Sequence, residues 1–134
     1  MKNISFILIA VLVSIFVGCN QTEENINPTS EWLLVAQLMD PGDGSGTFQP
    51  VTSDKTVSFF EDGTITSENG SICIGELWSG GTSSSGTYSE STMIIDVTNC
   101  TGGHAPLSYE MNGGFLILNY ACIEPCREKY ELVN

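Results

Sequence analysis

The stretch KTVSFFEDGTITS (55–67) holds the pattern that decides the fold. Val57 and Phe59 alternate with polar neighbours, and this period of two is typical of a strand with one buried face. Glu61-Asp62-Gly63 then provides a turn signal, and Thr64-Ile65-Thr66 repeats the alternation. The stretch therefore predicts an antiparallel hairpin.

The same pattern continues to the end of the chain. The strand-like segments after this hairpin are 87–89, 93–97, 107–111, 115–120 and 129–133. Between them lie turn signals such as Asn112-Gly113-Gly114, and SGGTSSSG (79–86), which has no side chain able to anchor a core and is predicted to be a loop. Seven to nine short strands without a convincing long helix indicate an all-β antiparallel meander. Closure into a barrel is favoured because an open sheet would leave exposed edges.

The segment before the hairpin is ambiguous. Trp32, Val35, Ala36 and Met39 match one face of a helix, yet the same run also fits a strand that is buried on both faces, and periodicity does not separate the two. The following DPGDGSGTFQP (40–50) predicts a long turn-rich loop, because its glycines and prolines suit neither a helix nor a packed strand.

The first 18 residues predict a bacterial lipoprotein signal peptide. Lys2 precedes an apolar run from Ile4 to Val17, which fits a secretory signal and is too short to span a bilayer. Gly18 directly before Cys19 indicates cleavage at a lipidated cysteine, although Phe16 and Val17 stand where Leu and a small residue are usual. Plain secretion and an uncleaved anchor are the alternatives.

Residues 19–29 are polar and acidic, and they predict a flexible tether that links lipid to a single domain over 30–134. The full chain carries a formal charge of −12, and its only basic residue in the signal segment is Lys2. Nucleic acid is excluded as a partner, because binding phosphates requires clustered Lys or Arg. Stable membrane attachment would come from the acyl chains.

Five cysteines leave an even set of four once Cys19 is assigned to lipid. In an oxidising exported compartment Cys73, Cys100, Cys122 and Cys126 favour two disulfides, for which three connectivities exist. We expect Cys73 to pair with Cys100 and Cys122 with Cys126. A zinc site is the rival interpretation, but the chain has one His and no Cys-x-x-Cys pair.

Several segments, taken in their order along the chain, resemble the small lipocalin-like lipoproteins of Bacteroidetes. They are WLLV (32–35), DPGDGSGTFQPV (40–51), VSF (57–59) with EDG (61–63), GTY (86–88) and CIEPCREKY (122–130). The resemblance implies an up-and-down β-barrel of about eight strands, with the first segment as a strand. It also implies that Arg127 packs across Trp32, as a late Arg does in lipocalins, and by analogy that a small apolar ligand is bound. The acidic stretch after Cys19 resembles surface-export signals of that group, which suggests an outer-membrane lipoprotein displayed at the cell surface.

The candidate site residues are mainly apolar. The large side chains that could line a ligand cavity are Phe59, Trp78, Met93, Phe115 and Tyr120, although core packing would explain them equally well. Asp40 and Asp43 are weak calcium candidates; the competing interpretation is a structural loop whose carboxylates bond nearby backbone N–H groups. His104, the single His, has no identifiable nucleophile beside it, and we expect it at the surface.

These observations lead to two functional hypotheses and no cofactor. The first is a non-enzymatic, membrane-anchored binding module that holds a small apolar or amphipathic ligand in the barrel. The second is an interaction domain with a packed barrel, which contacts another envelope protein through the loops 40–50 and 79–86. An enzyme is not expected, because no nucleophile, base and orienting group can be assembled from the chain.

Overall fold

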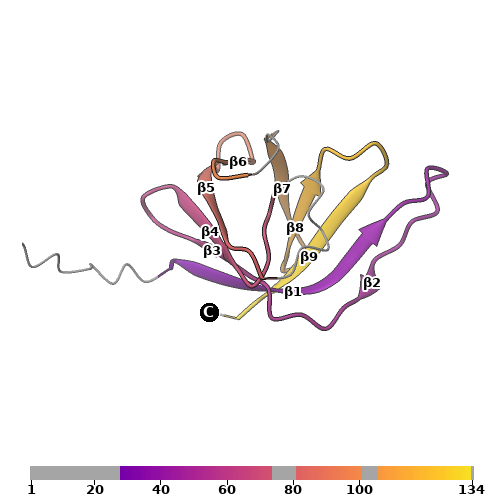
Figure 1. Ribbon diagram of the computed structural model, residues 1–134, viewed down its shortest axis with the longest axis horizontal. Helices are drawn as coiled ribbons and strands as arrows, with labels where there is room; N and C mark the ends of the chain where they lie inside the picture. Colours follow the sequence, from indigo (N-terminus) through magenta and orange to yellow (C-terminus); the bar gives the residue numbers. More distant parts are fainter. Residues whose placement is uncertain (1–27, 74–80, 101–105, 134) are drawn as a thin grey trace, which may run out of the picture.

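The computed structural model describes residues 28–73, 81–100 and 106–133. Every regular element in these ranges is a β-strand (Figure 1). They are β1 (Ser30–Met39), β2 (Gln49–Pro50), β3 (Thr56–Phe59), β4 (Thr64–Glu68), β5 (Ser84–Ser89), β6 (Ile94–Val97), β7 (Leu107–Asn112), β8 (Phe115–Tyr120) and β9 (Cys126–Leu132). Within the same ranges, no helix is long and apolar enough to cross a bilayer.

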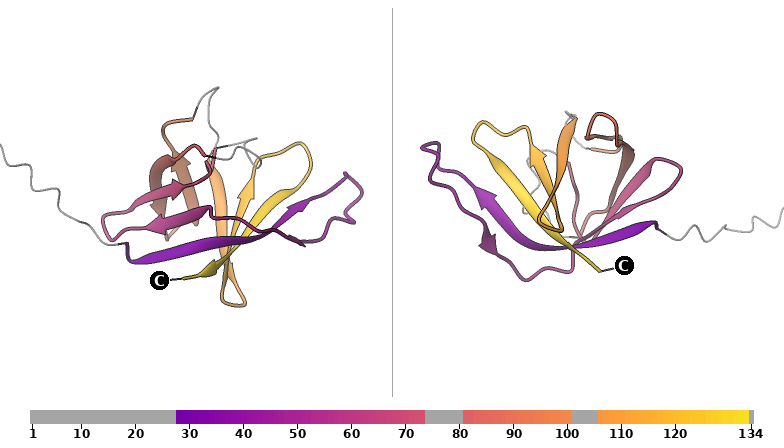
Figure 2. Two further views of the ribbon diagram at one scale, coloured as in Figure 1. Left: turned by 60° about the horizontal axis from the view of Figure 1, so that its bottom comes forward. Right: turned by 180° about the vertical axis from the view of Figure 1, so that it is seen from behind.

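The strands form a closed antiparallel barrel. Strands β3 to β9 pair with their neighbours in chain order, and β9 returns to pair with β1, which closes eight strands into a ring. The short β2 is a ninth strand that pairs with the second half of β1, while the first half of β1 pairs with β3. Both views in Figure 2 show β1 and its connection to β2 reaching beyond the other strands. The predicted all-β, up-and-down barrel is confirmed.

The structure resolves the ambiguous first segment as strand β1, so the helical alternative is wrong. The predicted loop 79–86 is corrected in part, because β5 already begins at Ser84 and only 81–83 of its described residues lie outside a strand. Ser84 is buried, and its hydroxyl lies 2.6 Å from that of Ser67 on the paired strand β4. A short hydroxyl can therefore be buried in this barrel because a neighbouring strand supplies a partner.

Alternation along each strand places the core inside the barrel. The central layer of the barrel is fully packed by side chains with almost no exposed surface, among them Val57, Ile65, Ile95, Leu107, Leu118 and Tyr130. Gly86 allows β5 and β6 to approach closely here, since a Cβ at this position would lie 2.2 Å from the carbonyl oxygen of Asp96. Among the described residues, the side chains in the middle of the barrel are thus closely packed and shielded from solvent.

The two ends of the barrel differ. The turns β3–β4, β5–β6 and β7–β8 and the start of β1 share one end, which we call the pocket end. The connections β4–β5, β6–β7 and β8–β9 share the other, which we call the disulfide end because Cys73–Cys100 and Cys122–Cys126 lie there. Both predicted disulfides are confirmed.

Candidate functional site

An apolar pocket of about 310 Å³, open to solvent on one side, lies at the pocket end. Four aromatic and two Met side chains make up most of its wall. The lining residues are Thr29, Ser30, Trp32, Phe59, Tyr88, Glu90, Met93, Tyr109, Met111 and Leu116. The volume falls at the lower limit for small-molecule sites, which suits one small ligand.

The aromatic wall is held by contacts among its own rings and with the backbone. Phe59 meets Tyr88 edge to face at a centroid distance of 4.8 Å, and it lies 5.7 Å from Tyr109. The Tyr88 hydroxyl donates to the carbonyl of Phe60 at 2.9 Å, and the Trp32 indole N–H donates to Ser30 Oγ at 3.0 Å. Burial raises the pKa of Tyr88 and Tyr109, and the nearby Glu90 carboxylate adds to both increases. Both phenols are therefore neutral at physiological pH.

Met93 occupies the rim of the pocket in a strained backbone conformation. Its φ is 56°, in the left-handed region that non-glycine residues rarely adopt. The turn holds it there, because the N–H of Met93 donates to the Ser89 carbonyl and its own carbonyl accepts from the Tyr109 N–H, both at 2.9 Å. Such strain is often kept where it positions a side chain for binding.

The structure brings together only part of the predicted ligand-binding set. Phe59 and Met93 line the pocket. Tyr120 instead lies at the disulfide end, and Phe115 lies beside Lys129, whose Nζ is 5.0 Å from its ring centroid. The placement of Phe115 follows from strand alternation, since Leu116, Leu118 and Tyr120 are the residues of β8 that join the core. Trp78, His104 and Cys19 lie outside the described residues.

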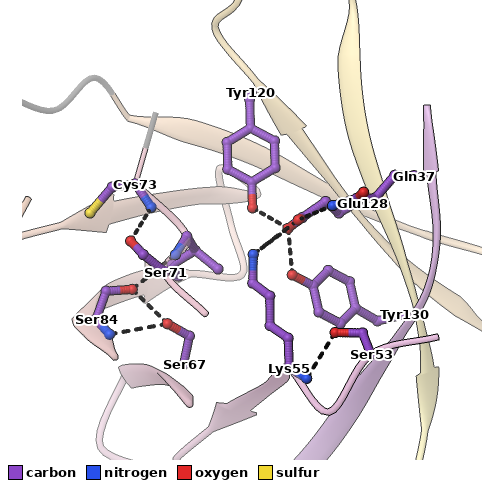
Figure 3. A network of polar contacts seen from close by, with 11 residues as sticks. Gln37, Ser53, Lys55, Ser67, Ser71, Cys73, Ser84, Tyr120, Glu128 and Tyr130 are labelled. Carbon is purple, nitrogen blue, oxygen red and sulfur yellow. Dashed lines mark hydrogen bonds and ion pairs between the residues drawn. The ribbon is translucent and has the colours of Figure 1, made fainter. Parts of the chain in front are cut away.

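A buried ion pair that sequence reasoning missed lies at the disulfide end. Lys55 Nζ is 2.9 Å from both carboxylate oxygens of Glu128, and Glu128 is fully buried. Gln37 Nε2 donates to Oε1 at 3.0 Å, and the hydroxyls of Tyr120 and Tyr130 each donate to Oε2 at 2.5 Å. Figure 3 shows these side chains converging on Glu128. Within the described part of the chain, every buried side-chain nitrogen or oxygen has a partner.

The two tyrosines are held as permanent donors to this carboxylate. Burial raises the pKa of Tyr120 and Tyr130 well above 10, and the negative charge of Glu128 raises both further. The Glu128 carboxylate accepts five hydrogen bonds, and its residue has no solvent-exposed surface. This geometry favours a structural role for the cluster over general acid–base chemistry.

A β-bulge places Gln37 in the cluster. Leu34 pairs with Tyr130 and Ala36 pairs with Lys129, so the extra residue Val35 shifts the alternation of β1. Without that shift, Gln37 would point away from the lumen. Gly70 makes room for the Lys55 side chain, since a Cβ there would lie 2.7 Å from Lys55 Cδ.

The structure does not bring Arg127 to Trp32. Arg127 is exposed and pairs with Leu38 and Asn119 near the disulfide end, whereas Trp32 pairs with Leu132 and lines the pocket. Among the described residues, the cation found over aromatic rings is Lys129, whose Nζ lies 4.6 Å from the ring centroid of Phe48 and 5.0 Å from that of Phe115. The Arg–Trp pairing implied by the resemblance is therefore wrong.

The loop after β1 is organised by one carboxylate. Asp40 Oδ1 accepts from the N–H groups of Gly42 and Gly44 at 2.7 and 3.0 Å, and Oδ2 accepts from Gly46 at 2.9 Å. Asp43 accepts from the Ser45 N–H at 2.9 Å. These bonds are the contacts with nearby backbone N–H groups that the structural interpretation of the two aspartates predicts. They also lower the pKa of Asp40, chiefly through Gly46 and Gly44.

Asp40→Asn is expected to lower the melting temperature at neutral pH, because the amide nitrogen cannot accept the Gly46 N–H. The pKa of Asp40 in the folded protein lies below 3.8, the usual value for an aspartate. Its contribution to stability is therefore complete above that pH and is lost as the pH falls below it. Thermal melts from pH 7 to 2.5 should show the difference from wild type shrinking in acid. Asp43→Asn should cost less, since that exposed carboxylate accepts a single backbone bond from a neighbouring residue. Equal melting temperatures for Asp40→Asn and wild type at pH 7 would contradict this role.

Comparison with protein-family models, with curated proteins and with solved structures found no match. The pocket, the ion pair and the disulfides are therefore interpreted from their own geometry.

Proposed function

We propose that the protein is a non-enzymatic lipoprotein of the cell envelope, anchored through Cys19, that binds a small apolar or amphipathic molecule at the pocket end of its barrel. The single observation that carries the binding role is the pocket itself. A wall of aromatic and Met side chains leaves about 310 Å³ open, whereas the described side chains in the middle of the barrel are almost completely buried. Apolar area kept exposed in this way is costly unless something covers it.

The remaining polar groups limit the chemistry of the pocket. The Trp32 N–H and the Tyr88 O–H donate to neighbouring protein atoms, and Glu90 is an exposed carboxylate at the edge. No nucleophile with an adjacent base lines the described pocket, which favours binding over catalysis.

Native and intact mass spectrometry of protein purified from host membranes tests the proposal. We expect a mature chain that begins at a diacyl- or triacyl-modified Cys19 and a co-purifying small molecule. An unmodified Cys19 would overturn the anchor, and wild type free of any bound molecule would count against the binding role.

A filled pocket provides the matched test of the site. Met111→Trp adds bulk to a pocket residue that is half exposed, and it is expected to remove the co-purifying molecule. Thr82→Trp adds the same bulk at an exposed position near the disulfide end and should retain it. Equal occupancy in the two variants would show that the molecule binds elsewhere.

A second candidate function, contact with an envelope protein, is favoured by one surface. The loop after β1 lies against the β8–β9 turn, since the Asp40 N–H donates to the Pro125 carbonyl at 3.0 Å. That turn presents Ile123 fully exposed, and Met39 beside it is half exposed. Cross-linking from the exposed position 124 of the same turn in intact cells would identify such a partner. Loss of capture when Ile123→Ser is added to that cross-linking variant would support this role, and equal capture with and without Ile123→Ser would contradict it.

A further inference from the structure

From the aromatic wall, the carboxylates around it and the absence of any described basic residue from its lining, we infer that the pocket selects a small organic cation: a substituted ammonium group carried on an apolar body. This inference rests on the proposed binding function and names the ligand class of the same site. Its first support is the wall, because Trp32, Phe59, Tyr88 and Tyr109 converge on one space. Aromatic faces attract a cation within about 6 Å of the ring centroid.

The second support is the charge at the rim. Glu90 lines the pocket, and Glu61 and Asp62 lie in the neighbouring β3–β4 turn. The pKa of Tyr88 is raised mainly by burial, and the negative charges of these three carboxylates raise it further. The field at the mouth is therefore negative.

The basic residues of the described chain lie elsewhere. Lys55 is paired with Glu128 at the disulfide end, and Arg127 is exposed near the same end. Lys129 lies over the rings of Phe48 and Phe115. None of them is among the residues that line the pocket, so the carboxylates at the rim have no counter-ion within the described wall.

The polar atoms of the pocket wall also favour a cationic ligand over an anionic one. The indole N–H of Trp32 and the hydroxyl hydrogens of Tyr88 and Tyr109 are donated to Ser30 Oγ and to the carbonyls of Phe60 and Ser89. An anionic ligand would need such donors, and those of the three aromatic side chains are already engaged, which leaves the hydroxyls of Thr29 and Ser30 as the remaining side-chain donors of the described lining. The phenol oxygens retain acceptor capacity, which suits the N–H groups of an ammonium ion.

The test compares three probes of similar size: phenyltrimethylammonium as the cation, tert-butylbenzene as its neutral isostere, and benzenesulfonate as an anion. Binding is followed by NMR shifts of the Trp32 indole and the Met93 methyl group at low salt. We expect the cation to bind most tightly and the anion not at all. The preference should decrease with added salt, because the carboxylates at the rim are exposed and screened.

Charge removal gives the matched variants. Glu61→Gln/Glu90→Gln should weaken binding of the cation about two- to fivefold per carboxylate, and should weaken binding of tert-butylbenzene much less. Glu68→Gln removes an exposed carboxylate from the far end of β4 and should change neither. Asp62 is left intact because it bonds both the N–H and the hydroxyl of Thr64 in the turn.

The outcomes separate the two proposals. Equal binding of the cation and its neutral isostere, unaffected by the double substitution, would overturn the inference on charge and leave an apolar binding site. Shifts with benzenesulfonate alone would overturn it as well. If no probe moves the Trp32 and Met93 signals, the binding function itself fails.

Discussion

Lys55→Met is expected to lower the free energy of unfolding by about 3–5 kcal/mol, the typical cost of leaving one member of a buried ion pair without its partner. Glu128 is fully buried, and its two oxygens both contact Lys55 Nζ at 2.9 Å. The total free energy of unfolding of a domain of this size is about 5–15 kcal/mol. The variant should therefore lose a large fraction of its stability, and urea denaturation measures the loss.

The double variant Lys55→Met/Glu128→Gln should recover much of that loss. A neutral Gln at 128 keeps an acceptor for the phenols of Tyr120 and Tyr130 and removes the uncompensated charge. Lys129→Met is the matched control, because that cation lies over two aromatic rings on β8 and the loop before β2 and should contribute about 1 kcal/mol or less. A cost for Lys55→Met as small as that of Lys129→Met would contradict the assigned role.

Loss of the Cys73–Cys100 disulfide should have the next largest effect. The bridge joins residues 27 apart, and chain-entropy arguments assign it about 3.5 kcal/mol. The Cys122–Cys126 bridge, which joins residues four apart, is worth about 2 kcal/mol on the same basis. Ala replacements are preferred to Ser, because Cys73 and Cys126 are buried and a hydroxyl there would need a new partner.

Denaturation of the two double-Ala variants should place Cys73→Ala/Cys100→Ala below Cys122→Ala/Cys126→Ala in stability. The longer bridge ties the segment after β4 to the segment after β6 at the disulfide end, so its loss frees two connections, whereas the shorter one fixes a single turn. The reverse order would show that the turn contributes more than its loop length implies.

The barrel could be predicted from the sequence because each of its strands carries its own signal. The alternation around Val57 and Phe59 and the turn at 61–63 are local, and the structure has them as β3, β4 and their connection. The limit of β5 was missed because Ser84 and Ser85 look like loop residues. Their strand conformation depends on partners in β4, which local propensity does not record.

The candidate site was predicted less well. Phe59 and Met93 were predicted because large apolar side chains are candidates for lining a cavity. Phe115 was predicted for the same reason and lies outside the core, because the residues of β8 are apolar on both faces of the strand and composition does not show which of them enter the barrel. The sequence does contain a signal for the buried ion pair, in the alternation of its two strands. Lys55 shares the alternation of Val57, and Glu128 shares that of Tyr130, so strand parity alone places both charges inside the barrel. Pairing between them is visible only in three dimensions.

The start of β1 places the end of the N-terminal tether next to the pocket. Thr29 and Ser30 belong to the pocket wall, so the polypeptide enters the barrel beside the opening. A lipid on Cys19 would tether the pocket opening to the bilayer. The ten residue steps from Cys19 to Thr29 span at most about 35 Å when fully extended. The proposed binding pocket would then lie near the lipid headgroups, where amphiphiles concentrate, and the disulfide end would lie farther from the bilayer.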